Sequence, residues 1–264
     1  MTTAAVQSTS KYGDPKPWVE WAAGDADKAW LIADYADLAS KVARYFAVYR
    51  NDLVAAKVAD GFGTFSSGCY ILVAPVEGNK IVNGVKLLWD DHFGKAKISN
   101  EVAAAAKKEI VLGFFNFNYA WTESVQFFNS IGLAVGRALS PISIVGSASS
   151  IIVDTIKAVD DCVTLKDRVQ EYRTASGSTK ELRRDQIIYR AIDLTMRVIA
   201  VSLWVMAIIS ASCLIANVAC PIPFNAILII STVYVFLKGV TYFFEKSLEE
   251  DARRLNFSKE SCSP

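Results

Sequence analysis

Few side chains in this 264-residue chain have the types and spacing that catalysis or metal binding needs. The single histidine, His92, follows Asp90 and Asp91, but adjacent residues of a helix point in different directions and a zinc site needs further ligands. No Gly-x-Ser-x-Gly elbow accompanies the histidine. Gly61 and Gly63 lack the Gly-Lys-Ser/Thr ending of a phosphate loop. The sequence therefore predicts no catalytic residue, no metal site and no cofactor, and a protein that is not an enzyme.

Glu123 and Arg137 are the only charged residues between Glu109 and Asp154. A carboxylate in so apolar a segment is a candidate for a shifted pKa. We favour a structural role, with Glu123 paired with Arg137 or placed at a membrane surface. If residues 110–160 and the terminal apolar run instead formed a small transporter or pore subunit, both side chains would face its water path.

Cysteine usage and net charge exclude further classes of protein. The five cysteines are widely spaced and contain no C-x-x-C pair, which argues against a disulfide framework and a zinc site. Cys213 and Cys220 lie in an apolar run, where thiols act as small hydrophobic groups. The net charge is +1, so no global field attracts nucleic acid, and no nucleic-acid partner is expected.

The longest apolar run lies between Arg197 and Lys238 and contains no charged residue and no histidine. Its first half, residues 198–220, would form a helix of roughly 34 Å, enough to cross the ~30 Å hydrocarbon core of a bilayer. Pro221 and Pro223 then break the helix, because each lacks an N–H and clashes with the preceding turn. We predict a two-helix transmembrane hairpin over residues 197–244, with Lys238 extending toward the headgroups. The alternative is a pair of buried helices in a soluble bundle.

Basic residues on both flanks of the hairpin set its orientation. The positive-inside rule places both long flanks in the cytosol and the uncharged Pro-x-Pro turn on the far side. The topology-setting charges are Arg183, Arg184, Arg190 and Arg197 before the first helix, and Lys238 and Lys246 after it.

An amphipathic helix is predicted over residues 25–50. Its apolar positions recur every three or four residues and form one stripe. That stripe consists of Leu31, Tyr35, Leu38, Val42, Tyr45 and Tyr49. The stripe can pack within the helical domain of the protein, lie on a membrane surface or dock against a partner helix, and the sequence leaves these alternatives open.

The remaining segments complete an all-α organisation. Residues 1–24 form a Ser/Thr-rich, flexible N-terminus compatible with a secretion signal. Residues 25–196 form a helical domain, with two helices over 53–93, a membrane-associated middle region over 110–153, and a break at Ser176–Gly177. A cytosolic tail, residues 245–264, follows the hairpin. The expected fold is a helical membrane protein with an N-terminal amphipathic domain and a C-terminal transmembrane hairpin.

Several segments resemble the inclusion membrane proteins of chlamydiae, especially the class I accessible protein group. They are "DKAWLIADYADLASKVARYF", "AAAAKKEIVLGFFNFNYAWTESVQFFNSIGLA", "GSASSIIVDTIKAVDD" and the hairpin after "IIYRAIDLTMR". The resemblance implies a type III-secreted effector inserted in the inclusion membrane, with both termini in the host cytosol. Its helical domain would be displayed to host cytosolic or organelle proteins, or to further copies of the chain. Many members place the two spans nearer the N-terminus, which leaves the type of partner open.

Two of these stretches also resemble a second family. "GDADKAWLIADYADLASKVARYF" and "NYAWTESVQFFNSIGLA" are similar to the peroxin-eleven family of peroxisome-elongating proteins, although members of that family are more arginine-rich. That resemblance implies a peroxisomal membrane protein that shapes the bilayer with an amphipathic helix. Both resemblances imply a membrane protein that acts by contact rather than catalysis.

Overall fold

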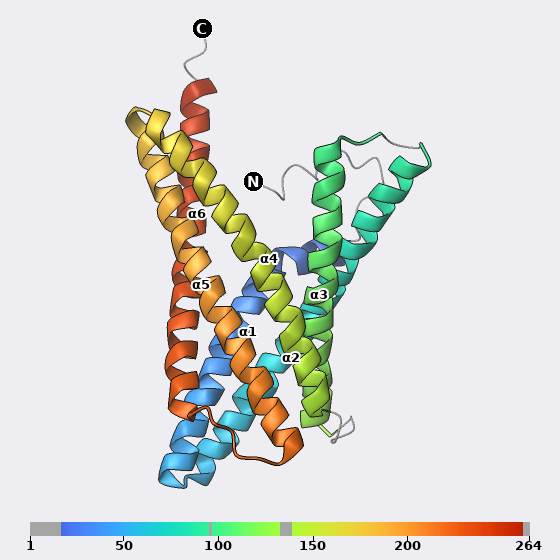
Figure 1. Cartoon of the computed structure of the whole chain (residues 1–264), viewed down its shortest axis with the longest axis vertical. Helices are drawn as coiled ribbons and strands as arrows, with labels where there is room; N and C mark the ends of the chain where they lie inside the picture. Colours follow the sequence, from blue (N-terminus) through green and yellow to red (C-terminus); the bar gives the residue numbers. More distant parts are fainter. Residues whose placement is uncertain (1–16, 95–96, 133–138, 261–264) are drawn as a thin grey trace.

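The computed structural model describes residues 17–94, 97–132 and 139–260, which form six α-helices and no strand. The helices are α1 (Pro17–Arg50), α2 (Leu53–His92), α3 (Asn100–Ser130), α4 (Leu139–Thr174), α5 (Gly177–Ala216) and α6 (Phe224–Glu260) (Figure 1). The predicted all-α fold is confirmed. Residues 53–93 form one long helix where the sequence predicted two, because α2 continues through Pro75 at an exposed position, at the cost of one backbone hydrogen bond.

Short polar residues fix the helix ends. Asp52 begins α2 by accepting hydrogen bonds from the Val54 and Ala55 amides at 2.8 and 3.2 Å. Ser99 begins α3 in the same way, by accepting a hydrogen bond from the Val102 amide at 3.2 Å. Asn217 ends α5 in the left-handed conformation, with φ 54°. The first helix of the hairpin therefore stops at Ala216, four residues before its predicted end at Cys220.

The six helices form a closed antiparallel ring. Each helix packs against the next one along the chain, and α6 packs against α1 to close the circle (Figure 1). The turn between α1 and α2 and the turn between α5 and α6 lie at the same end of the bundle, drawn at the bottom of the view. We call the half of the ring that contains these turns the lower half.

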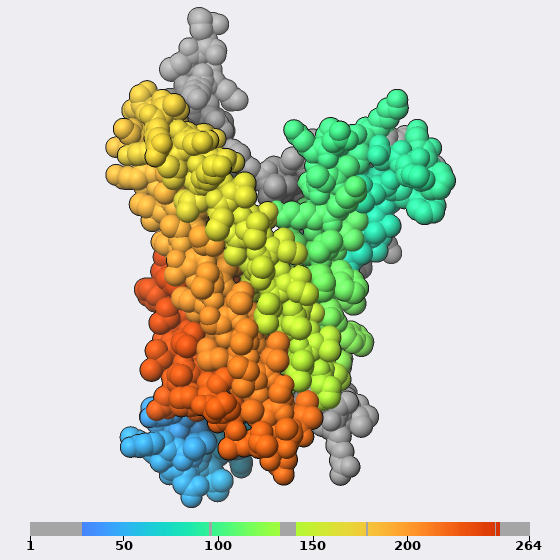
Figure 2. Space-filling view, viewed as in Figure 1, coloured from blue at the N-terminus to red at the C-terminus, as the bar shows by residue number. Residues whose placement is uncertain are grey.

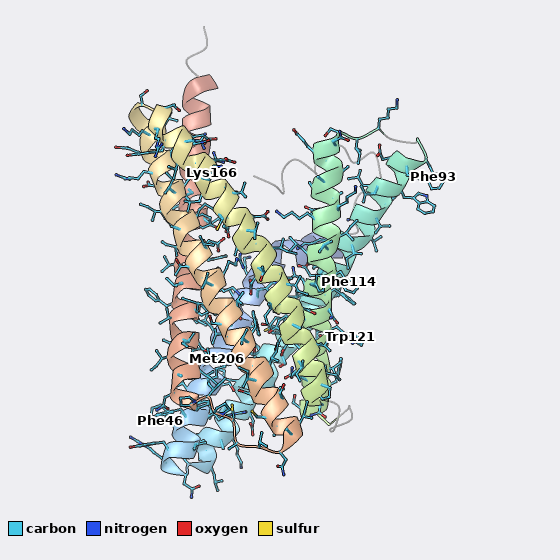
Figure 3. The ribbon with its side chains drawn as sticks, in the orientation of Figure 1. Phe46, Phe93, Phe114, Trp121, Lys166 and Met206 are labelled. Carbon is cyan, nitrogen blue, oxygen red and sulfur yellow. The ribbon has the colours of Figure 1, made fainter. Side chains whose placement is uncertain are left out.

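Small residues occupy much of the interior of the ring, apart from the buried Tyr70 and Tyr119. Ala33 on α1, Ala120 on α3 and Ala200 on α5 are almost fully buried, and Val73 on α2 is the largest fully buried side chain of the described residues. Large apolar side chains instead lie on the outer surface, including Phe46, Phe114 and Trp121 (Figure 3). Small residues inside and large ones outside are typical of helices that associate in a membrane.

Three helices are long and apolar enough to cross a membrane: Pro141–Thr174, Thr179–Ala216 and Phe224–Glu245. The second and third form the predicted hairpin. The first was expected only as part of a membrane-associated middle region. Three candidate spans support an integral membrane protein.

The upper half of the bundle divides into two arms. The α2–α3 pair and the α4–α5–α6 group diverge, and a notch separates them in the space-filling view (Figure 2). An ion pair between Lys108 on α3 and Asp160 on α4 joins the arms.

Candidate functional site

A cavity of about 250 Å³ lies inside the ring and receives side chains from all six helices. Four acidic and four basic residues line it, so the charges balance when all are ionised. The acids are Glu77, Asp154, Asp193 and Glu245, and the bases are Lys80, Lys157, Arg197 and Lys238. Because ionisable groups inside apolar helix bundles are costly, this cavity is the strongest candidate for a functional site.

Arg197 holds the α4–α5 side of the cavity. Its guanidinium contacts Asp154 of α4 at 3.2 Å and Asp193, one turn away on α5, at 3.5 Å. The indole N–H of Trp204 donates to the other oxygen of Asp154 at 2.9 Å. Arg197 Nε finds no partner among the described residues, so one donor remains for a ligand or a water molecule.

Lys238 closes the α1–α6 side. Its ammonium pairs with Asp34 of α1 and lies 5.7 Å from the ring centre of Trp30 and 5.8 Å from that of Tyr234. Both aromatic faces favour a cation at this distance. Lys238 therefore turns into the bundle, rather than extending toward the headgroups, because Asp34 offers it a partner there.

An aromatic cluster adjoins the cavity. Trp30 stacks on Tyr119 with ring centres 5.6 Å apart, and Tyr70 meets both rings edge-on. Trp204 lies against Tyr119 at 5.1 Å. These four residues belong to α1, α2, α3 and α5, so the cluster ties four helices together at one level of the ring.

A third polar group connects α2 and α3 at the cavity wall. Glu77 is buried and accepts hydrogen bonds from Lys80 at 2.8 Å and from Asn116 at 3.3 Å. A carboxylate with two such donors is well compensated for its burial.

Glu123 lies outside the cavity-lining set. Its carboxylate accepts hydrogen bonds from Ser67 of α2 at 3.2 Å and from Gln126 at 3.1 Å. Gln126 donates in turn to Ser143 of α4 at 3.3 Å. Arg137, the partner we predicted for Glu123, lies outside the described residues. The observed contacts give Glu123 a role in joining three helices.

The structure places the predicted hairpin turn and topology-setting charges as follows. Pro221 and Pro223 lie in the turn between α5 and α6. Three of the predicted charges, Arg190, Arg197 and Lys238, pair with interior acids. Arg183 and Arg184 pair with Glu171 and Asp185 in the upper arm, and the Lys246 side chain lies outside the described set.

The predicted apolar stripe of α1 is split by the structure. Tyr35, Val42 and Tyr49 are exposed on the outer surface, whereas Leu31, Leu38 and Tyr45 are half-buried. The face that packs inward carries the smaller residues Ala29, Ala33, Ala36 and Ser40. Of the predicted stripe, Leu31 lines the cavity.

Sequence reasoning missed Asp34, Asp154 and Asp193 as site residues. The available signals were Asp154 at the end of a long apolar stretch and the i, i+4 spacing of Asp193 and Arg197. Asp34 offered no such signal, because its partner lies on the last helix.

Chemically, the cavity can hold a small polar or zwitterionic group among paired charges, or use those charges only to fix the ring. Within residues 17–94, 97–132 and 139–260, no group of three or more metal-ligating side chains gathers.

The fold and site define a class: an all-α, six-helix protein with candidate membrane-spanning helices around a charged interior. No family model, curated protein or solved structure matches the chain.

Proposed function

We propose that the protein is a non-enzymatic integral membrane protein whose upper arms are displayed in the cytosol to partner proteins. The observation that carries the proposal is the division of the α5–α6 hairpin into an apolar half at its turn and a charged half toward the arms. On α5, no charged residue follows Arg197, whereas Arg183, Arg184 and Arg190 precede it. The diverging arms present helix surfaces at the charged end (Figure 1).

The chlamydial resemblance sharpens this proposal. It implies insertion in the inclusion membrane after type III secretion, with the charged arms and both termini facing the host cytosol. For the α5–α6 hairpin the positive-inside rule supports the same orientation, because basic residues flank the hairpin at its arm end and the α5–α6 turn carries no charge.

Two matched charge reversals test display. Arg184 in the upper arm and Arg44 near the α1–α2 turn have side chains 60% and 56% exposed, and each pairs with a neighbouring aspartate. Full-length chain in vesicles should capture cytosolic proteins through its arms, and Arg184→Glu should weaken that capture while Arg44→Glu leaves it unchanged. Equal effects of both variants, or none, would contradict display by the arms.

A second candidate function, a small transporter or pore subunit, is favoured by the charged cavity that all six helices enclose. Lys157 lines that cavity from α4, and Lys166 lies farther along the same helix on the outside. Solute or ion flux into proteoliposomes that falls with Lys157→Gln and persists with Lys166→Gln would favour transport. Absence of flux from the wild-type chain across a panel of ions, amino acids and sugars would leave display as the better account.

A further inference from the structure

Helices α1, α2 and α3 carry large exposed apolar side chains on their outer faces, although none of the three has the hydropathy of a membrane span. On α3 these side chains follow helical spacing at Phe114, Phe117, Trp121 and Phe128. On α2 they are Phe62, Phe65 and Leu72, and on α1 they are Ile32, Tyr35, Val42, Phe46 and Tyr49. We call these three rows the outer stripes. Contiguous exposed apolar surface of this extent indicates a covered interface.

The outer stripes lie at the level of the candidate spans. Tyr45 of α1 stacks on Phe224, the first residue of α6. Lys41, one turn before Tyr45 on α1, donates a hydrogen bond to Ser231, two turns after Phe224 on α6. Ser66 of α2 donates to the Ala33 carbonyl of α1 at 2.8 Å, which places α2 beside this stretch of α1. Helix α1 therefore lies beside the lower half of α6, and α2 lies next to α1.

Helix α3 is fixed at the same level from the other side of the ring. Asn118 donates to Ser149 of α4 at 2.8 Å, and Tyr119 lies against Trp204 in the uncharged part of α5. Trp121 follows two residues later and faces outward (Figure 3). An acyl chain beside the candidate spans would thus meet α3 at the same depth.

The low hydropathy of α3 comes from polar residues that face inward and are satisfied there. Asn118, Glu123 and Gln126 all form hydrogen bonds to side chains of the bundle. Ser40 and Ser66 likewise bond to carbonyls of the neighbouring helix. Hydropathy averaged around such a helix hides its apolar outer face, because only the outward residues would meet lipid.

We infer that α1, α2 and α3 also lie in the bilayer, so that lipid acyl chains cover the outer stripes and all six helices cross the membrane in the lower half of the ring. Lipid is the occupant because the apolar surface continues around the ring: Val198 and Val205 on α5 and Ile229 and Phe236 on α6 are exposed in the same way. A second copy of the chain would cover one side of the ring only. This inference rests on the proposed membrane integration.

The lengths and the charged edge fit this placement. Residues 32–45 of α1 span roughly 20 Å along the helix axis, which lies within the ~30 Å hydrocarbon core, and Phe46 and Tyr49 continue the stripe toward the headgroups. Tyr45 stacks on Phe224, the first residue of α6, and therefore lies at the level of the membrane edge. The exposed ion pair Arg44–Asp60 lies close to Tyr45. The α1–α2 turn extends below the α5–α6 turn, toward the headgroups and water of the far side (Figure 2).

Spin labels at matched exposed positions test the inference on the full chain in phosphatidylcholine vesicles. Single cysteines replace Phe65 on α2 and Trp121 on α3, both 55% exposed, in a cysteine-free background checked for wild-type helicity. Phe236 on α6 is the reference for lipid, and Val163 in the charged arm, 57% exposed, is the reference for water. Collisions with oxygen, which partitions into lipid, are compared with collisions with a water-soluble nickel chelate.

We expect labels at 65, 121 and 236 to favour oxygen and the label at 163 to favour nickel. Nickel access at 65 and 121, with oxygen access at 236, would overturn the inference and leave membrane integration standing. Nickel access at 236 as well would overturn the proposed integration itself. Protection of 65 and 121 from both reagents, with spin–spin broadening, would show that a second copy covers the stripes and would also overturn the inference.

Discussion

Lys238 forms an ion pair with Asp34, a residue 204 positions earlier in the chain, and this pair joins the last helix of the ring to the first. Both side chains are mostly withdrawn from solvent, with 20% and 15% of their surfaces exposed. Lys41 strengthens the same seam, because it bonds to both Asp37 of α1 and Ser231 of α6. The α1–α6 contact is less extensive than those between helices adjacent in sequence, so these polar groups have a large share in closing the ring.

Removing one partner of this pair should open the seam. Lys238→Met leaves the Asp34 carboxylate buried without its cation, which should lower the free energy of unfolding by about 3–5 kcal/mol. Lys238→Met combined with Asp34→Leu removes both charges and should recover most of that loss. Unfolding of the purified chain in mild detergent, titrated with a denaturing detergent, measures each variant. Additive losses in the double variant would show that the two residues do not act as a pair.

The last two helices and the turn between them could be predicted from the sequence because their signals are local. The uncharged run after Arg197, the proline pair Pro221 and Pro223 and the break at Ser176 all act within a few residues of themselves. The structure accordingly has α5, its turn and α6 close to where the sequence placed them.

The site could not be predicted, because its parts are distant in sequence. Nothing near Asp34 indicates that Lys238 will face it. Likewise, nothing near the polar residues of α3 indicates that Ser67, Ser143 and Ser149 on the neighbouring helices will be their hydrogen-bond partners. On α1 the large residues were expected to form one continuous stripe, and what would cover it was left open. The structure instead buries alanines, because small side chains let helices approach closely.

Helices α3 and α4 approach each other closely at Gly146. A Cβ there would lie only 3.2 Å from Thr122 Cβ and closer still to the Thr122 hydroxyl, which donates to the Tyr119 carbonyl. Gly146→Ala should therefore destabilise the chain by roughly 1–3 kcal/mol through overpacking. Thr122→Ala in the same chain should relieve most of this loss, and detergent unfolding of the three variants measures it.

Gly61 is the matched control for this prediction. It lies in α2 with open space around its Cα, so Gly61→Ala should raise stability by about 0.5–1 kcal/mol through helix propensity alone. A loss at Gly61 as large as that at Gly146 would refute the argument from close approach.

Cys220, exposed in the α5–α6 turn, should react faster than an ordinary thiol. A hydrogen bond from Ser210, whose Oγ lies 3.5 Å from the sulfur, lowers the pKa of Cys220, and a backbone contact with Ile222 adds to this effect. Thiolate is the reactive form, so Ser210→Ala should slow alkylation by iodoacetamide at pH 7.5. At pH 11 the alkylation rates of the wild-type chain and the Ser210→Ala variant should converge, because the Cys220 thiol is then ionised in both. A rate unchanged at pH 7.5 would show that the hydrogen bond does not act on the thiolate.

Labelling of single cysteines from one side of the membrane distinguishes the number of spans. With all six helices embedded, Ser10, Ser176 and Ser258 should label on the cytosolic side, while Leu53 and Ile222 should label only from the far side. A hairpin of α5 and α6 alone would move Leu53 to the cytosolic side. Three spans formed by α4, α5 and α6 would instead place Ser10 and Ser176 on opposite sides. Leu53 is the decisive position. It follows the α1–α2 turn and is 78% exposed, so its side chain is open to a charged maleimide. Only the six-span arrangement places Leu53 on the same side as Ile222 and on the opposite side from Ser10.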